Sequence, residues 1–223
     1  MRLSTVWQMA RICLLGAGLA GGVAQARMQT QDVAAACAGY GEDVQVMLEA
    51  DQALRGRQDY LAAPEDGGQA RRGAQLALVE RSNAARLETL LARCGWPLRS
   101  VHGAGAGKAA WQLVRHDLAL QQAAAPHLEQ ALAAGEADGP VLAQLLDRIA
   151  VAKGEPQHYG TQMRQLDACR WTPQPLDDRA RVEERRKQLG LPGLEEQEKQ
   201  ANLMVIHEGC ENQVATPALQ SAK

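Results

Sequence analysis

Apolar side chains recur every three or four positions through most of this sequence, a spacing that places them on one face of an α-helix. Glycines and prolines separate the periodic stretches, and a glycine followed closely by a proline, as at Gly95 and Pro97, ends a helix. No stretch alternates cleanly between apolar and polar residues, so no sheet is predicted. The predicted helices cover residues 31–57, 69–93, 108–125, 127–134, 140–153, 177–189 and 194–206. The glycines at 39 and 41 allow a break in the first of them.

The composition agrees with a helical protein that has an aliphatic core. Alanine, leucine, glutamine, glutamate and arginine dominate, and the 223 residues include no phenylalanine. The formal net charge of −2 provides no basic surface, so we expect no nucleic-acid partner. We predict an all-α fold, a single irregular multi-helix domain over residues 27–210, with a disordered tail at 211–223.

The N-terminus has the order of a secretory signal peptide. Arg2 and Arg11 precede an apolar stretch at 12–24, and the small residues Ala24 and Ala26 flank Gln25. The apolar stretch has about a dozen residues, whereas a membrane-spanning helix needs about 20. We therefore predict that residues 1–26 are a signal peptide cleaved before Arg27, that the protein is periplasmic or secreted, and that it has no stable membrane span.

Removal of the signal peptide would leave four cysteines, an even number in a compartment that permits disulfides: Cys37, Cys94, Cys169 and Cys210. Four cysteines allow three pairings, with free buried thiols as the alternative. Cys37 lies near the start of the first predicted helix and Cys94 at the end of the next. Antiparallel neighbours would bring these two ends together, so we favour Cys37 with Cys94, and Cys169 with Cys210.

The third predicted helix, 108–125, follows a small-residue linker at 103–107 and ends before Pro126. At about 100° per residue, Asp117 and Gln121 fall inside its broad apolar face, and His116 falls at the edge of that face. Polar side chains in a core-facing position need partners. They belong either to a structural hydrogen-bonded network or to a pocket in which burial adjusts the pKa of His116 or Asp117 for acid or base chemistry.

Two further polar features follow on the chain. Asp147 and Arg148 flank the polar side of the helix at 140–153, where a solvated charge pair is the usual interpretation. The loop at 153–161 is rich in donors and acceptors next to two glycines, a composition typical of binding loops and equally of a turn with a threonine cap.

These motifs together resemble an uncharacterised bacterial family of domains of unknown function. The motifs are Gly95-Trp96-Pro97, His116-Asp117 with Gln121 or Gln122, Asp147-Arg148, Tyr159-Gly160-Thr161-Gln162 and Arg185-Arg186. The resemblance covers about residues 69–194, and the Tyr-Gly-Thr-Gln signature after Asp-Arg is its most specific part. It implies candidate positions for a site without naming a reaction.

We therefore predict an exported envelope protein with a polar pocket that would suit a hydrolase-like activity. The alternative is a non-catalytic periplasmic protein-interaction module. The catalytic candidates are His116, Asp117 and Asp147, and the binding candidates are Gln121, Arg148 for an anionic group, Tyr159, Thr161 and Gln162. Zinc-protease, lipase, P-loop and dinucleotide motifs are absent from the sequence. We expect no cofactor and no metal, and a small polar ligand or another envelope protein as partner.

Overall fold

The computed structural model describes residues 35–60, 68–167 and 169–204, and it is mostly helical, as predicted. Its helices are α2 (Tyr40–Tyr60), α3 (Gly68–Cys94), α4 (Arg99–His102), α5 (Ala104–Val114), α6 (Leu118–Ala133), α7 (Gly139–Ala152), α8 (Arg179–Gln188) and α9 (Leu194–Met204), and its strands are β1 (Met163–Asp167) and β2 (Arg170–Pro173). The predicted signal peptide, Cys210 and the predicted tail lie outside the described residues. Within the described part, no helix combines the length and apolar character needed to cross a membrane.

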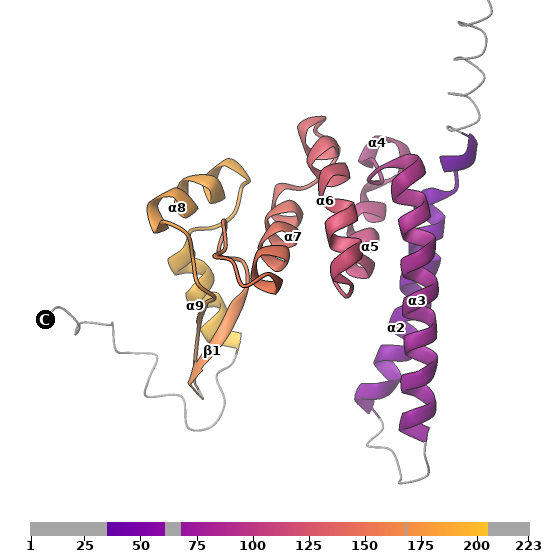
Figure 1. The fold of residues 1–223 in the computed structure, drawn as a ribbon, viewed down its shortest axis with the longest axis horizontal. Helices are drawn as coiled ribbons and strands as arrows, with labels where there is room; N and C mark the ends of the chain where they lie inside the picture. Colours follow the sequence, from indigo (N-terminus) through magenta and orange to yellow (C-terminus); the bar gives the residue numbers. More distant parts are fainter. Residues whose placement is uncertain (1–34, 61–67, 168, 205–223) are drawn as a thin grey trace, which may run out of the picture.

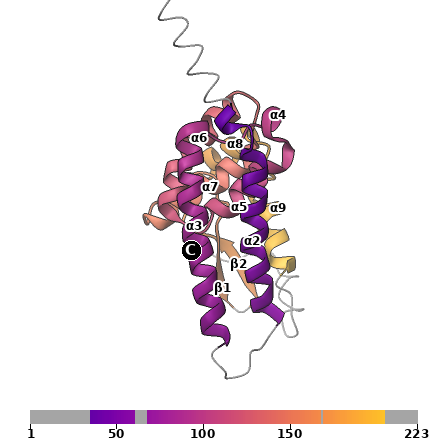
Figure 2. The same cartoon turned by 90° about the vertical axis from the view of Figure 1, so that its right-hand side faces the viewer.

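The helices form a row of neighbours that follows the order of the chain (Figure 1). The long α2–α3 hairpin stands at one end, and Figure 2 shows its two helices side by side in front of the others. Helices α5, α6 and α7 occupy the middle: α5 packs on α2 and α3, and α6 packs on α3 and α7. The short strands, α8 and α9 form the other end.

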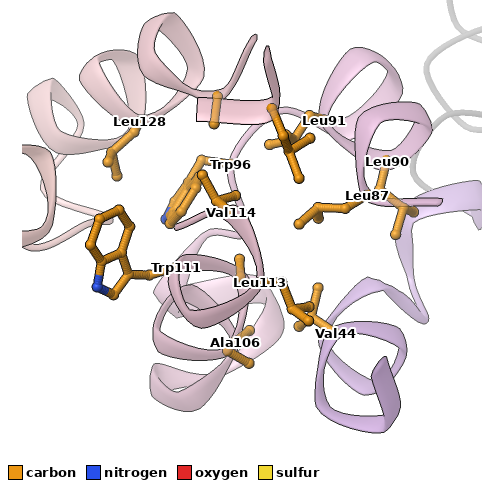
Figure 3. Packing of buried hydrophobic residues seen from close by; sticks show 14 of the residues in the cluster. Val44, Leu87, Leu90, Leu91, Trp96, Ala106, Trp111, Leu113, Val114 and Leu128 are labelled. Atoms are coloured by element: carbon orange, nitrogen blue, oxygen red, sulfur yellow. The ribbon is translucent and has the colours of Figure 1, made fainter. Parts of the chain in front are cut away.

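The apolar core lies where α2, α3, α5, α6 and α7 meet. Figure 3 shows the indole rings of Trp96 and Trp111 among aliphatic side chains that include Leu91, Val114 and Leu128. Each large apolar side chain buried in this way contributes about 1.5–3 kcal/mol. The core therefore holds together the middle of the row and the adjoining half of the α2–α3 hairpin.

The predicted helix at 108–125 is wrong in both of its limits. Helix α5 already begins at Ala104 and ends at Val114, and α6 begins at Leu118 and continues through Pro126 to Ala133. The break arises because Asp117 has an extended backbone and its carboxylate accepts a hydrogen bond from the Leu120 amide, which caps α6. Pro126 is tolerated because it lies on the exposed side of α6, where water can reach the carbonyl left without a donor.

Other helix limits agree with the sequence. Helix α7 has Pro140 at its start, and Asp178 caps α8 by accepting a hydrogen bond from the Arg181 amide. The break allowed at residues 39–41 is found close to that place: residues 35–37 are helical, a turn follows at 38–39, and α2 begins at Tyr40. Gly41 packs directly against α4, since a Cβ atom there would lie 2.6 Å from the His102 carbonyl oxygen.

The sequence did not predict the small sheet. Strands β1 and β2 pair antiparallel, with Met163 opposite Pro173 and Gln165 opposite Trp171. The strands have five and four residues and hardly any buried side chains, so no alternation marks them. Helix α9 supports β2, because the Asn202 side chain accepts from the Trp171 amide (2.7 Å) and donates to the Trp171 carbonyl (3.1 Å).

The favoured disulfide between Cys37 and Cys94 is confirmed, with a Cα–Cα distance of 5.8 Å. It ties the chain just before α2 to the last residue of α3. Closure of such a loop contributes about 4 kcal/mol in the chain-entropy account of disulfides. Cys169 is also disulfide-bonded; since Cys210 lies outside the described residues, the second pairing stays a prediction.

Candidate functional site

Asp147 anchors the loop that carries the Tyr-Gly-Thr-Gln signature. Its side chain is completely buried, at 0% exposure. One carboxylate oxygen accepts hydrogen bonds from the amides of His158 (2.9 Å) and Tyr159 (3.0 Å). The other accepts from the amide (2.8 Å) and the hydroxyl (2.9 Å) of Thr161. Four donors satisfy both oxygens, which makes burial of this charge possible.

Gln157 closes the same loop from its other end. Its side-chain amide donates to the carbonyls of Gln162 and Gln174, both at 3.0 Å, and its side-chain oxygen accepts from the Gln162 amide. The Gln162 side chain in turn donates to the Thr161 hydroxyl. The side chains of Thr161 and Gln162, predicted to bind a ligand, therefore engage in hydrogen bonds within this loop.

Arg186 holds the signature loop from the side of α8, and it is only 1% exposed. Its guanidinium donates to the carbonyls of Pro192 (2.7 Å) and Tyr159 (2.5 Å) and to the side-chain oxygen of Gln197 (2.8 Å). The Gln197 amide then donates to the Gly160 carbonyl (2.6 Å). Every nitrogen of this buried guanidinium has an acceptor, so α8 and α9 are fixed to the loop.

We call Asp147, residues 157–162, Arg186 and Gln197 the Asp147 cluster. Burial lowers the pKa of Arg186, while the negative charges of Glu183 and Asp147 oppose that shift. The cluster contains one buried anion and one buried cation, each surrounded by backbone groups. Its geometry suits a structural connection between α7 and the C-terminal helices.

His116 and Asp117 lie elsewhere, in an open cleft of about 310 Å³ between α2, α3 and the corner that joins α5 to α6. We call it the His116 cleft. Its lining residues are Asp51, Ala77, Glu80, Arg81, Asn83, Ala84, Leu113, His116 and Asp117. The structure thus brings two of the three catalytic candidates together and places the third, Asp147, in the buried cluster.

Two carboxylates from α2 and α3 form the inner part of the His116 cleft. Asp51 is 4% exposed and accepts two hydrogen bonds from Arg55, at 2.8 and 3.0 Å. Arg55 also makes an ion pair with Glu80, which links the two helices of the hairpin. The side-chain nitrogen of Asn83 donates a hydrogen bond to the Met47 carbonyl (3.1 Å), and its side-chain oxygen accepts none from the described residues.

The surroundings of His116 favour its neutral imidazole. Its Nε2 atom accepts a hydrogen bond from the Arg115 guanidinium (3.1 Å), which requires that nitrogen to be unprotonated. Burial lowers the pKa of His116, and the positive charges of Arg55 and Arg115 lower it further. At Asp117 one oxygen caps α6, and the other has no hydrogen bond from the described residues.

Gln121 and Arg148 meet at the backbone of Arg115. The Gln121 side chain, 5% exposed, donates to the Arg115 carbonyl at 3.0 Å, and Arg148 donates weakly to the same oxygen at 3.4 Å. The Arg148 guanidinium also lies 5.8 Å from the centre of the Trp111 ring. These residues adjoin the His116 cleft through Arg115 without lining it.

Tyr159 joins the Asp147 cluster by its backbone, while its hydroxyl makes no hydrogen bond with the described residues. Burial raises the pKa of this half-buried hydroxyl. Over the described ranges, no three His, Cys, Asp or Glu side chains are placed to hold a metal ion.

The sequence analysis did not predict several residues of the Asp147 cluster and of the His116 cleft. Asp51 and Arg55 are four apart on a helix, the spacing of an ion pair, and this was an available signal. Arg186 belongs to the Arg185-Arg186 motif, but it stands in a mixed charge run typical of a solvated helix, so no site role was predicted for it. Gln157 and Gln197 gave no signal.

Comparison with known proteins adds one match. A family model described as a family of unknown function (DUF6624) matches residues 40–204, from the first residue of α2 to the last of α9. No curated protein and no solved structure matches the chain.

Proposed function

The chain belongs to the family of unknown function DUF6624, and we propose that it is a non-catalytic binding protein of the bacterial cell envelope whose His116 cleft takes a small polar ligand. One observation carries the proposal. The cleft is an open space of about 310 Å³ with charged and polar side chains from three separate parts of the fold. A concave site with convergent polar groups is the usual form of a small-molecule site.

The lining favours a ligand rich in hydrogen-bond donors. Among the described residues, one carboxylate oxygen of Asp117 and the side-chain oxygen of Asn83 accept no hydrogen bond. Asp51 and Glu80 add negative charge behind them, partly balanced by Arg55. An amine or a polyol would find acceptors here, and an ammonium group would gain from the carboxylates.

Two features favour binding over hydrolysis. The Nε2 lone pair of His116, which a general base would use, is occupied by the Arg115 guanidinium. Asp147 is completely buried and both of its oxygens are occupied, so it has no contact with a bound molecule. The Cys37–Cys94 disulfide supports an oxidising compartment, in line with export and cleavage before Arg27.

The ligand proposal can be tested by calorimetric titration of the purified protein with putrescine and with mannitol. We expect binding of at least one of them, with putrescine weakened about fivefold or more by Asp117→Asn, which removes charge and keeps a capping side chain. Glu88→Gln, at an exposed position of the same helix as Glu80, is the matched control and should bind normally.

Failure of both probes to bind, or equal weakening by Glu88→Gln, would contradict the ligand proposal. Hydrolysis of p-nitrophenyl acetate that Asp117→Asn or His116→Gln abolishes would contradict the non-catalytic part. The location is tested separately, by N-terminal sequencing of the protein from a periplasmic fraction: we expect Arg27 as the first residue, and an intact N-terminus in the cytoplasm would overturn export.

A further inference from the structure

Arg148 is a half-buried cation with no counter-ion among the described residues. Its Nε atom is buried and has no hydrogen-bond partner. Within the described part of the chain, Arg148 makes one hydrogen bond, the long one of 3.4 Å to the Arg115 carbonyl. No carboxylate of the described residues makes an ion pair with it. Buried polar atoms in folded proteins are normally hydrogen-bonded, so the Nε atom of Arg148 is in an unusual environment.

The Arg148 side chain reaches the backbone of a second arginine, since its Nη1 atom lies 3.4 Å from the Arg115 carbonyl oxygen. Burial is the main cause that lowers the pKa of Arg148, and the positive charge of Arg115 lowers it further. Arg115 uses its Nε for His116 and forms no ion pair with any described carboxylate. The positive charge of Arg115 therefore acts unfavourably on that of Arg148, and a bound anion would reduce this repulsion.

We propose that Arg148 and Arg115 form a binding site for an oxyanion, a carboxylate or a phosphate group of a ligand. The arginine fork matches the two oxygens of either group, which gives a paired hydrogen bond that a lysine cannot make. The Trp111 ring, 5.8 Å from the Arg148 guanidinium, supports its flat face and limits its movement. The Nη2 atom of Arg148 makes no hydrogen bond with the described residues and is not fully buried. It is therefore accessible to the anion.

The position of Arg148 is set by the fold. It follows Asp147 on α7, whose four hydrogen bonds fix that turn of the helix, and the buried Gln121 side chain holds the Arg115 carbonyl in place. The anion would therefore meet preorganised donors, which reduces the ordering that binding requires. This inference stands apart from the His116 cleft, which Arg148 does not line.

The experiment is a calorimetric titration of the full protein with inorganic phosphate and, in a second arm, with acetate, both at constant ionic strength adjusted with chloride. We expect millimolar or tighter binding of at least one anion, at least tenfold weaker in Arg148→Gln and about threefold weaker in Arg148→Lys, which keeps the charge and loses the fork. Arg164→Gln, at an exposed arginine of β1, is the control and should bind as the unchanged protein does.

The relative strength of the two arms distinguishes a phosphate from a carboxylate ligand, and either preference supports the site. Undetectable binding of both anions, or equal binding by Arg148→Gln, would overturn it. If Arg148→Gln does not fold, Arg115→Gln is the second variant. We expect it to weaken anion binding about threefold, and unchanged binding would contradict the proposed site. Putrescine binding measured in Arg148→Gln separates a failure here from a failure of the His116 cleft, because Arg148 does not line that cleft.

Discussion

The two ends of this molecule are stabilised in different ways. The interior shared by α2 to α7 is apolar, built on Trp96, Trp111 and the leucines around them (Figure 3). The interior between α7, α8 and α9 is largely polar, built on the completely buried Asp147 and Gln157 and on Arg186. Apolar contacts are non-directional and add by area, whereas the hydrogen bonds of Asp147 each require one atom in one place. Single polar atoms therefore matter more in the C-terminal region than single methyl groups do in the core.

The strongest test of this difference is Asp147→Ala. The change leaves four donors of the signature loop buried without an acceptor, and we expect a loss of about 4 kcal/mol or more, since each unsatisfied buried donor costs about 1–3 kcal/mol. Urea denaturation measures the loss. Hydrogen exchange should show residues 157–204 opening first, and uniform opening of the whole chain would mean that the two regions form one cooperative unit.

The counterpart in the apolar core is Leu128→Ala. Leu128 is 0% exposed and packs beside the two tryptophans, and we expect a loss of about 3 kcal/mol from transfer and cavity effects together. The same denaturation measurement applies. Here hydrogen exchange should rise in α5, α6 and α7, and the Asp147 cluster should keep its protection. A footprint confined to 157–204 would reverse our assignment of the two interiors.

Gly160→Ala tests how tightly the signature loop packs against the apolar side chains of the C-terminal region. Gly160 has a φ of +67°, and a Cβ atom there would lie 2.7 Å from Leu194 and 2.9 Å from Leu176. A left-handed backbone and two contacts of this kind should cost about 2 kcal/mol. Gly154→Ala is the matched control, because Gly154 has a φ of +74° and no atom lies within 4 Å of the added Cβ. Its loss of stability should be smaller, since only the backbone conformation contributes. Equal losses in the two variants would mean that only the backbone conformation matters.

The same contrast explains what the sequence could predict. Helix periodicity and the Cys37–Cys94 pairing depend on local spacing or on the ends of neighbouring helices, and the structure agrees with both, apart from the limits of α5 and α6. Asp147 stands beside apolar residues on a regular helix, and its partners lie 11 to 14 residues further along. No spacing rule links a helical carboxylate to amides of a distant loop, so a solvated pair was the natural interpretation.

The error at α5 and α6 has a similar origin. No glycine or proline stands between Val114 and Leu118, so the helical rotation was continued across the break and placed Asp117 in the core. The capping carboxylate of Asp117 was itself the stop signal. The cleft with Asp51 and Glu80 could not be predicted, because it needs the packing of three segments that the sequence does not order in space.

The smallest expected effect concerns pH and His116. Its pKa is lowered in the folded protein, so its contribution to stability is present above about pH 6.5, the ordinary value for histidine, and is lost as pH falls through the folded pKa. Protonation would place a positive charge beside Arg115 and break their hydrogen bond. Because His116 is exposed to solvent in the cleft, the loss between pH 7 and pH 5 should be small, a shift in the melting temperature near the limit of measurement. His116→Gln should remove that part of the pH dependence while leaving the Asp147 cluster intact, and a variant that kept the full pH dependence would assign it to groups outside the cleft.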